Sequence, residues 1–281
     1  LEADGVAGRE TLAALNVPAA ERVRGLLVNL ERWRWLPQEL GERHVMVNIA
    51  GFHLDLVDGG RSVLDMKVIV GRSYRRTPVF SDRIRYLVFN PQWEVPRKLA
   101  LQDVLPRVRE DTAYLEHKGF RVLEGWGADE RVVDPATVDW ASLGPDHWPY
   151  RFRQKPGPTN SLGVVKFMFP NKFDVYLHDT PAKDLFASSK RSFSSGCIRV
   201  ERALDLAEAL LKDDPGWTRE RIDATVGAER ERTVALRAPV PVHLQYWTAW
   251  ADEDGSIEFR EDLYRRDARV AKALRIEAPG S

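Results

Sequence analysis

The spacing of the apolar residues changes its period along this chain. Residues 19–37, AAERVRGLLVNLERWRWLP, repeat apolar side chains at helical spacing, and the closing proline predicts the end of a helix. Beyond residue 43 the period becomes two: Val45, Val47 and Ile49 alternate with polar residues, and a second alternating run follows Asp58-Gly59-Gly60. This pattern predicts a β-hairpin, with a further strand in RIRYLVFNP (83–91).

The β pattern is interrupted between residues 97 and 160. PRKLALQDVLPRVRED (96–111) predicts a helix with Pro96 near its first turn and Pro106 as a kink or an end. The stretch behind it is rich in proline, glycine and aromatic residues, which is typical of a subdomain or lid inserted into a β domain.

Strand patterns return in VVKFMFP (164–170) and FDVYLHD (173–179). An amphipathic helix is predicted in VERALDLAEALLKDD (200–214), and the tail predicts two strands around EDGS (253–256) followed by a helix. The fold class indicated is mainly β, α+β, with flanking helices.

Composition narrows the class of protein. Of the 281 residues, 43% are hydrophobic and 30% are charged, which is typical of a folded globular chain. Lys plus Arg and Asp plus Glu total 42 each, and this balance argues against a nucleic-acid-binding protein. The sequence has no apolar run of membrane-spanning length and no initiator methionine, so we expect a piece of a longer chain whose targeting signals lie elsewhere.

The single cysteine, Cys197, lies in SSGCIRV (194–200). One cysteine excludes an internal disulfide framework and a cysteine-rich zinc site, and the six histidines lack metal-ligand spacing, so we predict no metal site. A lone cysteine most often packs as a small apolar side chain. Here the small residues Ser194, Ser195 and Gly196 precede it, and they allow backbone N–H groups to approach a substrate carbonyl.

The second feature that favours a reactive thiol is the charge expected around it. A helix beginning near Val200 would place Cys197 just before a helix N-terminus, and the nearby cations of Lys190, Arg191 and Arg199 would favour the thiolate.

The third feature is His178 in YLHDTP (176–181), at the end of a predicted strand and 19 positions before the cysteine. Such a histidine is either a structural residue or a general base. Together the two residues describe a Cys–His pair, and their order in the chain excludes a papain-type enzyme.

YLHDTP followed by SFSSGCIRV resembles the catalytic signature of the L,D-transpeptidases, the YkuD-type cysteine enzymes that cross-link bacterial peptidoglycan. The family pattern is a histidine, a spacer, and Ser/Thr-His-Gly-Cys followed by an apolar residue and Arg or Asn. Ser195 replaces the second histidine, which leaves His178 as the one candidate base. The YcbB-like subfamily carries the same SSGC variant.

The resemblance implies a domain plan. Residues 1–20 resemble the end of a peptidoglycan-binding helical module, and 21–42 form a linker helix. The catalytic domain, a YkuD-like β-sandwich, covers 43–265 with a substrate-capping lid at 97–160, and 266–281 form a C-terminal helix and tail.

It also implies a mechanism that needs no cofactor. Cys197 attacks the third residue of a donor tetrapeptide stem, D-Ala leaves, and the N–H groups of Gly196 and Cys197 hold the oxyanion. A side-chain amine of an acceptor stem then resolves the thioester with His178 as base, which gives a 3→3 cross-link. Carbapenems, a class of β-lactam, would acylate the same cysteine.

Other residues receive supporting roles. Arg199 is expected to hold His178 or a loop carbonyl, to bind a substrate carboxylate, or to be a surface cation. Tyr176 shares a strand face with His178 and lines the pocket or packs in the core. Ser194 shapes the loop through hydrogen bonds to the histidine or the backbone.

Aromatic and basic residues of the inserted segment allow two interpretations each. Trp93, Trp126, Trp140 and Trp148 form either an aromatic wall against the substrate or a small local core. The run RFRQK (151–155) is either a solvated face or a basic patch that steers the anionic polymer.

Two alternatives remain open at this point. An L,D-carboxypeptidase or amidase would use the same Cys–His pair with water as acceptor, and a non-catalytic wall-binding protein would use only the N-terminal module. The resemblance also implies a periplasmic location, with an inner-membrane anchor as one possibility outside this sequence. The oligomeric state is not indicated.

Overall fold

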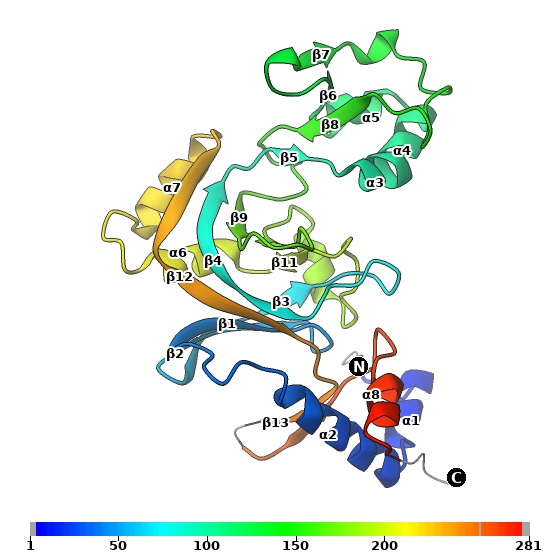
Figure 1. The fold of residues 1–281 in the computed structure, drawn as a ribbon, viewed down its shortest axis with the longest axis vertical. Coiled ribbons are helices and arrows are strands. Elements are labelled where there is room, and N and C mark those ends of the chain that lie inside the picture. The colour runs from blue at the N-terminus through cyan, green and yellow to red at the C-terminus, as the bar shows by residue number, and fades with distance from the viewer. Residues whose placement is uncertain (1–3, 253, 277–281) are drawn as a thin grey trace.

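The computed structural model describes residues 4–252 and 254–276 and is elongated, with three tiers (Figure 1). A β-barrel forms the middle tier, a smaller sheet with short helices lies at one end, and helices from both chain ends lie at the other. Across the described ranges, no helix has both the length and the apolarity needed to cross a bilayer.

Helices occupy the flanks of the barrel and the inserted segment. The α-helices are α1 (Arg9–Leu15), α2 (Ala19–Trp33), α3 (Arg97–Leu99), α4 (Leu105–Glu110), α5 (Ala113–His117), α6 (Ala203–Leu211), α7 (Arg219–Gly227) and α8 (Asp267–Ala273). A π-helix, η1 (Ala100–Val104), joins α3 to α4, and the 3₁₀ turns are η2 (Gly127–Asp129), η3 (Pro135–Thr137) and η4 (Lys183–Ala187).

The strands fall into three sheets. The barrel contains β1 (Arg43–Asn48), β2 (His53–Asp58), β3 (Arg61–Ile69), β4 (Phe80–Phe89), β9 (Val165–Met168), β10 (Leu177–His178), β11 (Ile198–Val200) and β12 (Arg232–Gln245). The second sheet contains β5 (Trp93–Glu94), β6 (Phe120–Glu124), β7 (Arg131–Val133) and β8 (Tyr150–Gln154), and β13 (Ala249–Ala251) pairs with β14 (Ile257–Phe259).

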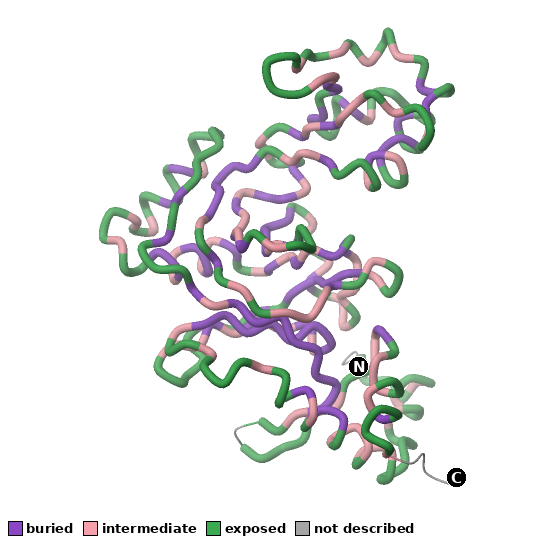
Figure 2. Tube along the Cα trace, viewed as in Figure 1, coloured by how far each residue is buried: buried purple, intermediate pink, exposed green. Residues whose placement is uncertain are grey.

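The long strand β12 closes the barrel, because it pairs in parallel with β1 and antiparallel with β4. Alternate side chains of the strands fill the interior, and Figure 2 shows the buried parts of the trace concentrated along them. The mainly β, α+β class predicted from the sequence is confirmed. The sequence predicts a sandwich, whereas these strands close into a single barrel.

The inserted segment forms a second subdomain, residues 93–154, with its own apolar core. Trp140 is buried in that core, and Trp93 and Trp148 pack against it. Trp126 is 69% exposed and lies under the Arg151 guanidinium, 3.7 Å from the ring centroid. The local-core interpretation therefore holds for three of the four tryptophans.

The basic run in β8 is paired with acids inside this subdomain. Arg151 and Arg153 each contact both Glu94 and Glu130, at 2.7–2.8 Å. The two arginines lower the pKa of Glu130 to about 2. The two arginines of this run are therefore paired within the subdomain, which favours a structural role for them over steering of a polymer.

Most predicted elements are present, with two differences. The Gly59-Gly60 turn joins β2 to β3, and β1 is an additional strand before that hairpin. The helix predicted near Val200 was wrong: Cys197 leads into strand β11, and α6 starts only at Ala203. Cys197 therefore does not lie at a helix N-terminus.

Candidate active site

Two short parallel strands position the candidate catalytic residues. β10 and β11 pair Leu177 with Ile198 and His178 with Arg199, and the Ile198 N–H donates to the Tyr176 carbonyl at 3.1 Å. Leu177 and Ile198 are fully buried in the barrel core. Because side chains alternate along a strand, their neighbours face the opposite side. Those neighbours are Tyr176, His178, Cys197 and Arg199.

Ser194 holds the cysteine loop in shape. Its hydroxyl donates to the Cys197 carbonyl at 2.5 Å and accepts the Gly196 N–H at 3.1 Å, while its own N–H donates to the Val70 carbonyl. The side chain is buried and contacts the backbone rather than His178. Gly196 has φ +125°, a conformation that essentially only glycine adopts. The sequence SSGC thus encodes a tight loop that presents the thiol.

The backbone N–H groups of this loop are not equivalent. The Gly196 N–H is already used by Ser194, as described above. The N–H groups of Ser195 and Cys197 have no acceptor among the residues that the structure describes. They are the donors best placed to receive an oxyanion.

Cys197 is half-buried, and its Sγ donates a long hydrogen bond of 3.8 Å to the Asp174 carbonyl. Burial raises the pKa of the Cys197 thiol, and this outweighs the opposing effects of hydrogen bonding to Tyr176 and of the Arg199 charge. Arg199 thus favours the thiolate, as the sequence suggested, but its effect is smaller than that of burial. Lys190 pairs with Glu10 and Glu261, and the Arg191 guanidinium donates to backbone carbonyls.

His178 is buried and neutral. Burial lowers its pKa to about 3, and the charges of Arg199 and Lys166 act in the same direction. Its Nδ1 lies 2.5 Å from the Asp179 carbonyl, a contact that requires Nδ1 to carry the proton. The lone pair is thus on Nε2, as a general base requires. No hydrogen bond joins this ring to the Cys197 thiol within the described ranges.

Lys166 is a site residue that the sequence reasoning missed. It lies opposite His178 on β9, so Lys166, His178 and Arg199 form a row across three neighbouring strands. Burial lowers the pKa of Lys166, and the Cys197 thiolate would raise it. The signal in the sequence was a charged residue inside the apolar strand VVKFMFP, which is uncommon unless the residue is paired or functional.

Arg199 has an unsatisfied guanidinium. Its Nε is buried without a hydrogen-bond partner, and burial lowers the pKa of the group. It holds neither His178 nor a loop carbonyl among the hydrogen bonds of the described chain. A buried donor without an acceptor is costly, which favours the carboxylate-binding role of the three considered.

Tyr176 links the thiol to the second subdomain. Its ring lies beside that of His178, with centroids 5.7 Å apart, and Lys166 Nζ lies 5.8 Å from its centroid. Burial raises the pKa of the Tyr176 hydroxyl strongly, and hydrogen bonding to Cys197 adds to this, while hydrogen bonding from Trp93 opposes it. Tyr176 therefore lies beside His178 and also packs against the barrel core, so the structure supports both interpretations of this residue.

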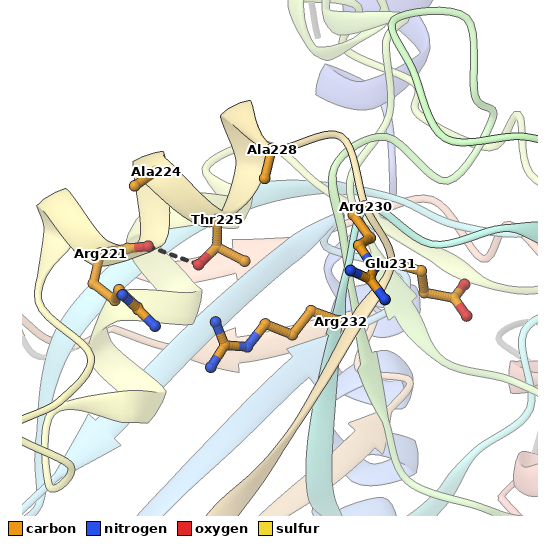
Figure 3. A pocket seen from close by; sticks show the side chains of 7 residues that line it. All are labelled: Arg221, Ala224, Thr225, Ala228, Arg230, Glu231 and Arg232. Carbon is orange, nitrogen blue, oxygen red and sulfur yellow. Dashed lines mark hydrogen bonds between the residues drawn. The ribbon is translucent and has the colours of Figure 1, made fainter.

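A separate hollow of about 460 Å³ lies between α7 and the start of β12 (Figure 3). Arg221, Arg230 and Arg232 line it, and the Thr225 hydroxyl donates to the Arg221 carbonyl at 2.8 Å. None of its lining residues belongs to the site around Cys197.

Residues 42–233 match the family model of the YkuD L,D-transpeptidase catalytic domain. The chain belongs to the L,D-transpeptidase family. A curated Haemophilus influenzae protein, provisionally named an L,D-transpeptidase, is 37% identical over 245 residues, which is 87% of this chain. That alignment covers 48% of the relative, so the chain spans about half the length of the curated protein it matches. The family is one of cysteine-dependent acyltransferases.

Solved L,D-transpeptidase structures are similar to this chain only at a low level. The enzyme from Mycobacterium smegmatis has 11% identity and a TM-score of 0.33, over 73% of this chain and 58% of its own. L,D-transpeptidase 3 from Mycobacterium tuberculosis, with a faropenem-derived adduct, has 14% identity and a TM-score of 0.33, over 73% and 60%. The family assignment therefore rests on the sequence matches.

Proposed function

We propose that this L,D-transpeptidase forms 3→3 cross-links in peptidoglycan, with Cys197 as nucleophile and His178 as base. The observation that carries the proposal is that His178 ends β10 while Cys197 directly precedes the adjacent parallel strand β11, with the proton of His178 on Nδ1. This geometry leaves Nε2 as the acceptor for a thiol proton.

The first step acylates the enzyme. Cys197 Sγ adds to the carbonyl carbon of the third residue of a tetrapeptide stem while its proton passes to His178 Nε2. The N–H groups of Cys197 and Ser195 hold the oxyanion. The tetrahedral intermediate then breaks its bond to the D-Ala nitrogen, which takes the proton from His178, and a thioester remains.

The second step transfers the acyl group. A side-chain amine of an acceptor stem attacks the thioester carbonyl and gives its proton to His178. The intermediate expels the Cys197 thiolate, which takes the proton back, so that the enzyme returns to its starting state. No metal or cofactor enters this sequence.

The pKa values of Cys197 and His178 in the free enzyme fit a mechanism in which the thiol gives up its proton as the sulfur attacks the substrate carbonyl. A thiol with a raised pKa and an imidazole with a pKa of about 3 do not form an ion pair before the substrate arrives. The charges of Lys166 and Arg199 also make the imidazolium short-lived, so the proton passes on to the leaving group.

Lys166 and Arg199 are proposed to bind carboxylates of the donor stem. Both flank His178, and neither forms a salt bridge with a carboxylate among the described residues, although the charge of Glu231 acts on Lys166. A stem peptide carries several carboxylates, and one of them would satisfy the buried Arg199 Nε.

The remaining proposals concern the domains, the inhibitors and the cellular compartment. We assign the inserted segment predicted at 97–160, which the structure describes as the subdomain of residues 93–154, as the substrate-capping lid of a YcbB-like enzyme. Residues 1–20 are assigned as part of a peptidoglycan-binding module. β-Lactams of the carbapenem class are proposed to acylate Cys197, and the periplasm is the proposed compartment.

Purified tetrapeptide muropeptides provide the test. After incubation, mass spectrometry should detect a dimer that has lost one D-Ala, and Cys197→Ala should form none. Release of D-Ala with only tripeptide monomers would instead identify an L,D-carboxypeptidase. Binding to sacculi without any product, together with no carbapenem adduct on intact Cys197, would identify a wall-binding protein.

A further inference from the structure

Arg75 joins the second subdomain to the cysteine loop. It lies in the segment between β3 and β4, residues 70–79, and its side chain is only 8% exposed. Its guanidinium donates to Asp103 at 2.5 and 2.9 Å, to Gln102 at 2.8 Å and to the Ser195 hydroxyl at 2.8 Å. Ser195 lies two positions before the nucleophile.

The acceptors on the far side are built into the second subdomain. Asp103 and Gln102 lie on the π-helix η1, whose Ala100 and Val104 are buried in the core of that subdomain. A short π-helix inside an α-helical run places side chains out of the usual register and is frequent at functional sites. Movement of the subdomain would therefore pull directly on Asp103.

The segment that carries Arg75 is fixed to the cysteine loop by its backbone. The Arg72 N–H donates to the Ser194 carbonyl at 3.1 Å, and the Thr77 hydroxyl donates to the Gly196 carbonyl at 2.8 Å. Gly71 is essential to this packing, because a Cβ there would lie 2.1 Å from the Arg75 carbonyl oxygen. The position of the Arg75 side chain is thus tied to the geometry around the thiol.

A carboxylate bound by both nitrogens of a guanidinium is a directional contact, and it is lost if either partner moves. The same Nη1 that binds Asp103 also binds Ser195, so one side chain connects both bodies.

We propose that Arg75 is a positioning residue that couples closure of the second subdomain to the arrangement of the oxyanion-binding loop. With Asp103 seated on Arg75, Ser195 is held and the N–H groups of Ser195 and Cys197 point together at the reacting carbonyl. Without Asp103, the thiol stays intact while the oxyanion donors lose their fixed direction. This inference rests on the proposed function of Cys197.

The test compares two reactions at the same sulfur. Iodoacetamide alkylates a thiol without an oxyanion, whereas acylation by a carbapenem or a tetrapeptide stem needs one. In Arg75→Gln and Asp103→Asn we expect alkylation rates within about twofold of the wild type, and acylation rates lower by about 10- to 100-fold. Because both variants break one link, the double variant should be no slower than the slower single variant.

Matched control variants test whether the loss of any nearby charge or ion pair would lower the acylation rate. Arg76→Gln removes the neighbouring arginine, which donates to the Ser73 carbonyl, and Glu110→Gln breaks an exposed pair with Arg107 in the second subdomain. Both should acylate like the wild type. Arg75→Lys keeps the charge but not the paired geometry and should recover only part of the rate.

Hydrogen exchange supplies a readout independent of catalysis. Backbone amides of residues 97–110 should exchange faster in Arg75→Gln at an unchanged melting temperature. Wild-type acylation rates in the variants, or equal losses in alkylation and acylation, would overturn the coupling. A wild-type protein that forms no acyl-enzyme would instead overturn the proposed function, and the exchange result would still test the link between the two bodies.

Discussion

His178 lies directly opposite Arg199, the imidazole on β10 and the guanidinium on the parallel strand β11. Lys166 lies opposite the same imidazole on its other side, on β9. The buried base therefore sits between two half-buried cations, and both oppose its protonation. The two cations therefore help to keep the His178 imidazole neutral down to acidic pH.

Acid should destabilise the fold through His178. Its pKa is about 3 in the folded protein against 6.5 ordinarily, so between these values the unfolded chain binds a proton that the folded chain does not. The free energy of unfolding should therefore fall as the pH drops through this interval, by about 1.4 kcal/mol per unit at most. Urea unfolding at several pH values, with His178→Gln as the comparison, isolates this contribution. Parallel curves for the two proteins would contradict it.

Arg199→Gln should raise the pKa of His178. Removing the facing cation makes the imidazolium less unfavourable, although burial still holds the value below that of an exposed histidine. NMR titration of the ring protons measures the shift. The control is Arg202→Gln, whose guanidinium contacts Asp65 instead, and it should leave the titration unchanged. A lowered pKa in Arg199→Gln would refute the electrostatic role.

Tyr176→Phe should make the thiol less acidic. Hydrogen bonding to the Tyr176 backbone, which phenylalanine keeps, and to the Tyr176 hydroxyl lowers the pKa of Cys197 against the larger effect of burial, so losing the hydroxyl leaves burial less opposed. The pH profile of iodoacetamide alkylation should move to higher pH, with a severalfold slower reaction at neutral pH. Tyr114→Phe, in the second subdomain, is the matched control. An unshifted profile would mean that the hydroxyl does not act on the sulfur.

Gly196→Ala and Gly157→Ala should lose similar stability, but only Gly196→Ala should also lose activity. Both glycines have large positive φ, +125° and +137°, and at neither would a Cβ meet an atom closer than 3.9 Å. Each alanine should therefore cost about 1–3 kcal/mol through backbone strain alone. Only Gly196→Ala should also lose transpeptidation by more than about tenfold, because the cysteine loop shifts. Chemical denaturation and product assays together check this expectation.

The sequence was informative where local pattern decides structure. Alternation predicted the strands around Val45 and the β2–β3 turn, and the motif around Cys197 led to the family that the later matches confirm. The loop role of Ser194 also follows from its place in the motif, since a hydroxyl next to a glycine turn usually bonds to nearby backbone.

What failed depended on contacts between distant segments. Lys166 joins the site only through the pairing of β9 with β10, and no spacing along the chain reveals that register. The acidity of the Cys197 thiol was misjudged because burial was unknown and because Lys190 was already paired with Glu10 and Glu261. Val200 was assigned to a helix because its apolar neighbours fit the helical period, whereas pairing with β3 makes it a strand residue.

The pairing of β1 with β12 has a practical consequence for how this domain can be made. The family match ends at residue 233, only just inside β12, which runs to Gln245. A fragment cut at that boundary would leave one edge of β1 and one edge of β4 with unpaired backbone groups, and such edges promote aggregation. The same topology makes closure a late event in synthesis, because Val45 must wait for Val242 to leave the ribosome before the two strands can pair.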